Sequence, residues 1–155
     1  MKRLSLVLAI LCLAVPAFAA EKKTELMASG SYLKLDGGHS VWQVGGDLLF
    51  PLTSGGVLMM GPSVVVASED VFTRGGALLE VNVPGQSGGF FFGGSAYHIL
   101  DTPDGEQDWT ALVRAGIKLP VAKSGIVKVY LEQIVDGAGK DYADLMGTVA
   151  LGIAF

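Results

Sequence analysis

The chain has 155 residues, of which 50% are apolar and 17% charged, and it contains 22 glycines. Its length is that of one domain, its apolar fraction excludes intrinsic disorder, and its excess of acidic over basic residues excludes an electrostatic nucleic-acid binder. Beyond the extreme N-terminus, no run approaches the roughly 20 apolar residues that a membrane-spanning helix needs. The hydrophobicity is therefore distributed over shorter segments.

The first 19 residues predict a secretory signal peptide. Two basic residues open the chain, an apolar run over 4–15 follows, and Ala17-Phe18-Ala19 places small residues at the two positions that a signal peptidase reads. The apolar run is too short for a membrane anchor, and a proline interrupts it. We expect an exported domain over 20–155.

The one cysteine, Cys12, lies inside this leader, and Leu11 precedes it where a lipoprotein would have a small residue. The exported domain therefore has no disulfide framework and no thiol chemistry. We also expect no cofactor and no metal.

Clusters rich in Gly, Pro and Asp interrupt the exported domain seven times. They predict eight strands, over 24–35, 40–50, 56–67, 75–83, 89–99, 109–119, 125–134 and 142–155. Alternation is clearest in the last segment, where Val149, Leu151 and Ile153 alternate with smaller residues. A period of two indicates strands. The segments 24–35, 56–67 and 89–99 alternate poorly, so their inward residues stay unassigned.

Charges are sparse on the strands, whereas a soluble barrel would carry a surface about a quarter to a third charged. We therefore expect the large apolar face to meet lipid and a polar set to fill the lumen, with small residues such as Gly116 and Ala150 relieving the crowding. The polar set is Asp47, Glu80, Arg114, Lys118, Lys128 and Glu132. Because an open sheet edge cannot cross a bilayer, the expected fold is all-β: an eight-stranded antiparallel up-and-down transmembrane β-barrel.

The turns predict an orientation. Three of them, 51–56, 84–88 and 120–125, are short and carry one charge, whereas the other four hold most of the acidic residues. Outer-membrane barrels have short periplasmic turns and longer outer loops. Aromatic residues near strand ends predict an interfacial belt, with Trp42, Tyr97, Trp109 and Tyr142 at the outer rim and Phe50 and Phe155 at the inner rim.

The leader, the eight amphipathic segments and the terminal Ile153-Ala154-Phe155 together resemble small eight-stranded outer-membrane β-barrel proteins of the OmpA/OmpX-like type. The resemblance implies that Leu151, Ile153 and Phe155 form the signal read by the barrel-assembly machinery. It also implies a bacterial outer membrane as the location, with outer-membrane lipid and lipopolysaccharide as partners. The outer loops are shorter than is common in the family, which disfavours an adhesin or a receptor.

Catalytic candidates are few. Lipid A deacylases of this architecture use a His-x-Ser pair, but His39 directly precedes Ser40, and Ser95 and His98 have opposite parity. The segment 101–108 holds four carboxylates but lacks the spacing of an EF-hand loop. We interpret the histidines as rim residues and the segment as a solvated acidic loop.

The lumen charges have two interpretations, an ion pathway or a closed interior in which opposite charges pair. We favour the closed interior because eight strands leave little room for water. The resulting hypothesis is a structural or interaction protein without enzymatic turnover. The alternatives are an enzyme that modifies lipid A or phospholipid, which lipid A mass spectra would reveal, and a soluble lipocalin-like barrel that holds an apolar ligand.

Overall fold

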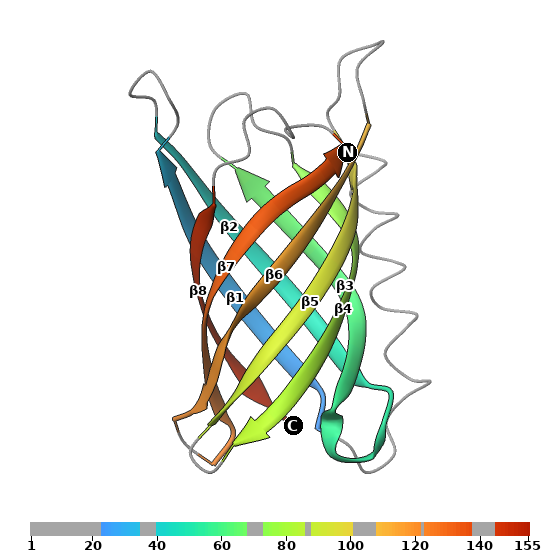
Figure 1. Cartoon of the computed structure of the whole chain (residues 1–155), viewed down its shortest axis with the longest axis vertical. Coiled ribbons are helices and arrows are strands. Elements are labelled where there is room, and N and C mark those ends of the chain that lie inside the picture. The colour runs from blue at the N-terminus through green and yellow to red at the C-terminus, as the bar shows by residue number, and fades with distance from the viewer. Residues whose placement is uncertain are drawn as a thin grey trace.

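The computed structural model is a closed barrel of eight antiparallel strands, each paired with its neighbours in chain order (Figure 1). The structure describes residues 23–34, 40–67, 73–85, 88–100, 108–121, 123–137 and 145–155. The predicted fold class is confirmed. The strands are β1 (Glu25–Lys34), β2 (Ser40–Pro51), β3 (Leu58–Ala67), β4 (Arg74–Gly85), β5 (Gly88–Ile99), β6 (Trp109–Pro120), β7 (Gly125–Gly137) and β8 (Met146–Ala154).

The barrel closes where β1 meets β8. The two strands pair from Glu25 opposite Ala154 to Tyr32 opposite Gly147. Beyond the last pair, the backbone N–H of Thr24 donates to the carbonyl of Phe155 at 2.8 Å, and the N–H of Phe155 donates back at 2.9 Å. The sheet therefore has no free edge along this seam.

The predicted strand boundaries shift by a few residues. The third strand starts at Leu58 because a short 3-10 turn over Ser54–Gly56 precedes it, and the fourth already begins at Arg74. The eighth strand starts at Met146. Positions 142–144 of its predicted range and the whole predicted signal peptide lie outside the described residues.

Side chains alternate between an apolar exterior and a polar interior. On β7, Lys128 and Glu132 are buried while Val129 and Leu131 are exposed, and on β8 Val149 and Leu151 are exposed. This is the expected assignment of faces: the large aliphatic residues point outward, and the charged residues point into the barrel.

The structure also resolves the three strands whose faces the sequence left unassigned. In β5, Phe90 and Phe92 are 62% and 57% exposed, whereas Phe91 between them is fully buried. Inward residues of β1 and β3 include Glu25, Met27, Met59 and Ser63, all of them buried. The run of three phenylalanines hides the alternation of β5 in the sequence, because residues of one type point to both faces. In the structure, successive side chains still point to opposite faces.

Two aromatic residues depart from the predicted interfacial belt. Trp42, Trp109 and Phe155 are exposed as expected, but Tyr97 is only 4% exposed because its parity in β5 points it into the lumen. Phe50 is also buried, although it shares the outward parity of Trp42. Tyr142 lies outside the described residues.

The connections gather at two ends of the barrel (Figure 1). The end formed by the connections β2/β3, β4/β5 and β6/β7, together with the C-terminus, is called the turn end below. The opposite end, where β1/β2, β3/β4, β5/β6 and β7/β8 connect, is called the loop end. No helix in the described part of the chain is long and apolar enough to cross a bilayer.

Close packing inside the barrel leaves no room for a side chain at Gly116. A Cβ added there would lie 2.3 Å from the carbonyl oxygen of Val129 and 2.4 Å from the Cβ of Tyr130. We expect Gly116→Ala to lower the free energy of unfolding by about 1–3 kcal/mol, the range for overpacked interiors. Urea unfolding of the refolded barrel measures the change.

Gly30 provides the matched control, since a Cβ added there meets nothing within 4 Å. Gly30→Ala should leave the unfolding midpoint unchanged or slightly raised, because it also restricts the unfolded chain. Equal effects of the two substitutions would contradict the packing derived for Gly116.

Candidate functional site

All six residues predicted to form the polar set lie on the inward face of the barrel. Five of them are buried, and Lys118 is partly buried near the turn end. Together with Glu25 and Arg74, which the sequence analysis did not place there, they line the described lumen with four acidic and four basic side chains. The described interior is therefore formally neutral.

Glu80 lies at the centre of this interior. Its carboxylate accepts a hydrogen bond at 2.9 Å from Arg114 on β6 and bonds of 2.7 Å and 2.9 Å from the ammonium group of Lys128 on β7. The Glu80 and Lys128 side chains are 0% and 1% exposed. Neither charge can be hydrated, so each depends on its partners.

Arg114 connects Glu80 to a second carboxylate. Its Nη1 donates to Asp47 on β2 at 3.0 Å, while its Nη2 is the donor to Glu80. The two terminal nitrogens of the guanidinium thus hold carboxylates from two different strands, which the planar fork of arginine favours. Asp47 also accepts a hydrogen bond of 2.5 Å from Ser63, whose hydroxyl lies 2.8 Å from the hydroxyl of Tyr97.

Toward the turn end, the pairing continues through Glu25. Its carboxylate lies 3.2 Å from the Lys128 ammonium group and forms an ion pair with Lys118. Lys118 also donates to Asn82 at 3.3 Å, and Asn82 donates to the carbonyl of Gly56 at 3.0 Å. The network therefore reaches the turn between β2 and β3.

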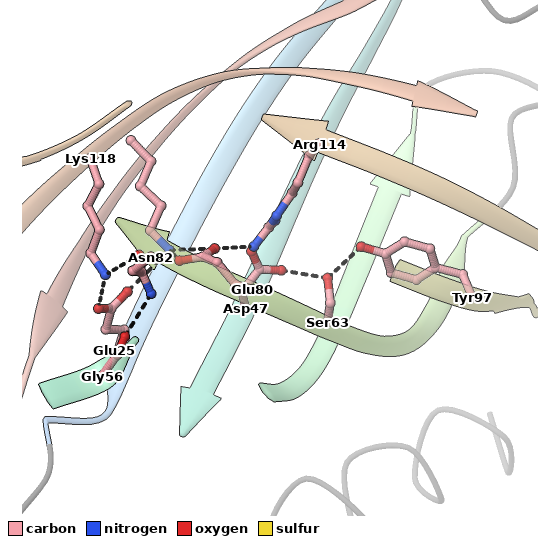
Figure 2. Close-up of polar contacts among 10 residues, drawn as sticks. Glu25, Asp47, Gly56, Ser63, Glu80, Asn82, Tyr97, Arg114 and Lys118 are labelled. Atoms are coloured by element: carbon pink, nitrogen blue, oxygen red, sulfur yellow. Dashed lines mark hydrogen bonds and ion pairs between the residues drawn. The ribbon is translucent and has the colours of Figure 1, made fainter. Parts of the chain in front are cut away.

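Figure 2 shows these contacts as one continuous chain across the lumen. From Tyr97 to Asn82, it joins inward side chains of all seven strands from β1 to β7. We call this set the lumen network; it consists of Glu25, Asp47, Ser63, Glu80, Asn82, Tyr97, Arg114, Lys118 and Lys128. Because it crosses the interior at mid-height, it blocks a straight path for water or ions.

Two aromatic rings fill the space beside the network. The guanidinium of Arg114 lies 5.7 Å from the ring centre of Phe91 and 5.2 Å from that of Tyr130. The Lys128 ammonium group lies 5.1 Å from the Phe91 ring. These cation–π contacts add to the carboxylate contacts that stabilise the two buried cations.

The loop-end half of the interior is less tightly paired. Arg74 donates to Gln43 at 2.9 Å and stacks 5.2 Å from the Tyr97 ring, while Glu132 accepts a hydrogen bond from Thr148 at 3.0 Å. Among the described residues, no cation lies within ion-pair distance of Glu132. Arg114 faces it across the β6–β7 ladder but turns toward Asp47 and Glu80.

A cavity of about 10 Å³ remains between Asp47, Tyr97, Arg114, Tyr130 and Glu132. This is close to the smallest volume that can hold one water molecule. The Nε of Arg114 is buried without a hydrogen-bond partner. The mid-lumen is thus almost filled by side chains.

Sequence reasoning missed two of the lumen charges, Glu25 and Arg74. Arg74 lies just before the predicted strand 75–83, but it is the first residue of β4 and is buried. Arg74 is separated from Leu78 and Glu80 by an even number of residues in the chain numbering, which places all three on the same face of a strand. This spacing was the signal in the sequence that could have identified Arg74 as an inward residue. Glu25 lies on β1, whose alternation the sequence left unresolved.

Among the residues that the structure describes, the catalytic candidates do not come together. His98 points outward and is exposed, and its Nδ1 donates to the backbone carbonyl of Asp108 at 2.8 Å. His39 and positions 101–107 of the acidic segment lie outside the described residues. Within the residues that are described, no group of three or more potential metal ligands occurs.

The C-terminal residues Leu151, Ile153 and Phe155 all point outward and are exposed near the turn end. Ala154 between the last two faces inward beside the cluster of Met27, Phe91 and Tyr130. The terminal alternation thus presents one apolar ridge on the exterior.

No family model matches the sequence, and no curated protein is a significant relative. Solved structures share the fold. The N-terminal β-barrel domain of Pseudomonas aeruginosa OprF matches with a TM-score of 0.60 at 17% identity, over 86% of this chain and 98% of that one. A de novo designed transmembrane β-barrel matches with a TM-score of 0.56 at 12% identity, over 88% and 97% of the two chains. The fold is thus that of small eight-stranded transmembrane barrels.

Arg114 and Glu132 should differ in their contribution to stability. Arg114→Ala leaves Asp47 and Glu80 short of a partner in a dry interior, so we expect the free energy of unfolding to fall by about 3–5 kcal/mol. Glu132→Ala removes one hydrogen bond and no ion pair, and we expect a smaller loss. The heat-modifiable folded band on a gel and urea unfolding report both.

Glu132→Gln is the matched control, since an amide oxygen can still accept the Thr148 hydrogen bond. Its stability should stay close to that of the original chain. Unaltered folding of both alanine variants would refute the energetic importance of the lumen charges.

Proposed function

We propose that the chain is an integral outer-membrane β-barrel of a bacterium that has a structural or interaction role and no enzymatic turnover. The observation that carries this proposal is the combination of an apolar exterior with a described interior that is formally neutral and in which six of the eight charges form ion pairs. The network that fills the lumen uses its polar groups to pair with one another, which leaves few of them free to act on a substrate.

Strand length supports a membrane-spanning barrel. Strands of 9 to 13 residues with a rise of roughly 3.3 Å per residue and a tilt of about 40° climb about 23 to 33 Å, which matches the apolar band of such barrels, about 25 Å high. Val129, Leu131, Val149 and Leu151, all exposed, would then contact acyl chains. Outer-membrane lipid and lipopolysaccharide are the partners that this exterior fits.

In this proposal the turn end faces the periplasm, because its connections are short and carry little charge. The exposed ridge of Leu151, Ile153 and Phe155 would be the segment that the barrel-assembly machinery binds. The longer, more acidic connections of the loop end would face the cell exterior.

The lipocalin-like alternative fits the geometry poorly, since it requires an apolar cavity inside and charges outside. Here Glu80, Arg114 and Lys128 are inside and the aliphatic residues are outside. The enzyme alternative lacks a supporting arrangement among the described residues, where His98 faces away from the lumen.

Cell fractionation tests the location. We expect the chain in the membrane fraction, resistant to a high-salt wash and released by detergent, because its apolar exterior requires lipid or detergent around it. A soluble periplasmic protein from the same cells serves as the control. Recovery in the soluble periplasmic fraction would contradict the proposal.

Planar-bilayer recording tests the closed lumen. The purified barrel should give no steady current, because the lumen network spans the interior at mid-height. A large-diameter porin reconstituted in the same way verifies that insertion is detected. A stable current carried by the folded barrel would instead favour an ion pathway.

A further inference from the structure

The turn end of the barrel is hollow, in contrast to the filled mid-lumen. A cavity of about 550 Å³ opens there, with Lys118 and Glu25 of the lumen network in its wall. Its described lining comes from β1, from the turn-end parts of β3 to β8 and from the connections β2/β3 and β6/β7, so it occupies the mouth of the barrel. Its volume is typical of sites that bind small molecules.

The deep wall of this cavity is partly apolar. Met59 and Ile126 are inward and buried, and Ala154 packs beside the same cluster as Ile126. Ala154 and the inward prolines Pro84 and Pro120 also line the cavity and keep part of their surface open, so a short hydrocarbon chain can be removed from water against them.

The charges at the mouth do not balance. Among the described residues that line the cavity, Lys23, Lys118 and Lys123 are basic and Glu25 is acidic. Glu25 is already paired with Lys118 and with Lys128 deeper in the lumen. Lys23 and Lys123 are exposed and form no ion pair with any described residue. An excess of positive charge thus surrounds the opening.

Lys118 has a further donor to offer. An ammonium group carries three N–H donors and no acceptor. Glu25 and Asn82 accept two of these hydrogen bonds. The third is available at the cavity wall, because the Lys118 side chain remains 19% exposed while its partner Glu25 is buried.

We propose that the turn-end cavity binds a small anionic amphiphile, a phosphate or carboxylate head joined to a short apolar chain. Lys23, Lys118 and Lys123 hold the head by charge-assisted hydrogen bonds, and the chain packs against Pro84, Pro120 and Ala154. This binding activity goes beyond the structural role proposed above and does not depend on which way the barrel faces in the membrane.

The test is a titration followed by backbone amide NMR shifts of the refolded barrel, with butyl phosphate as the probe. A neutral maltoside detergent is used because it brings no competing anion. Amides of Asn82, Gly88 and Ile126 at the cavity should shift in a saturable way, while those of the loop-end half stay unchanged. Three matched probes are compared with butyl phosphate. Butanol has the same chain without a charge, butylammonium has the chain with a positive charge, and inorganic phosphate has the head without the chain.

We expect butylammonium and butanol to produce no saturable shift at these amides, and inorganic phosphate to bind at least fivefold more weakly than butyl phosphate. The double substitution Lys23→Gln with Lys123→Gln should weaken butyl phosphate binding at least tenfold. Neither lysine belongs to the lumen network, so the barrel should stay folded. Lys34→Gln, at the other end of β1, is the control and should bind like the original chain.

Three results would overturn the proposal: butylammonium binding as well as butyl phosphate, unchanged binding in the double variant, or shifts confined to the loop-end half. If inorganic phosphate bound as tightly as butyl phosphate, the apolar chain would contribute nothing to binding. That result would also overturn the proposal. Failure here leaves the fractionation and bilayer results unaffected, so this proposal and the structural role are tested independently.

Discussion

Closure of the sheet is the constraint on which the rest of the structure depends. The ladder between β1 and β8 completes a cylinder in which neighbouring strands satisfy one another's backbone groups. A closed sheet has two faces of opposite parity, so each strand divides its side chains between the exterior and a narrow lumen. The apolar exterior and the polar interior are two results of that one division.

The narrow lumen dictates how its charges are arranged. Charges withdrawn from water are tolerated when each has a partner, and Glu80 meets this condition by joining Arg114 and Lys128 from two other strands. A buried ion pair adds little stability relative to well-packed apolar groups, yet the loss of one partner is costly. The lumen network therefore acts mainly to fix which side chains meet inside the barrel.

The two ends of the interior differ in how their charges are partnered. The network is dense from mid-height to Lys118, and below it the mouth widens into the cavity rimmed by Lys23 and Lys123. Toward the loop end, Arg74 and Glu132 rely on neutral partners instead. The centre of the barrel is thus filled by the lumen network. The mouth at the turn end is open and carries basic side chains that small anions can reach.

The sequence by itself determined the fold class, the number of strands and the parity of the regular ones, because a period of two and glycine-rich turns are local properties. It also identified Asp47, Glu80, Arg114 and Lys128 as inward residues from that parity. The pairing among these four residues required the tertiary structure, since it joins side chains up to 67 positions apart on strands whose stagger the sequence does not specify. The inward side of Tyr97 also needed the structure, because the run Phe90-Phe91-Phe92 hides the alternation of β5. Arg74 precedes the predicted strand 75–83, and only its pairing with β3 and β5 shows that the ladder extends to it.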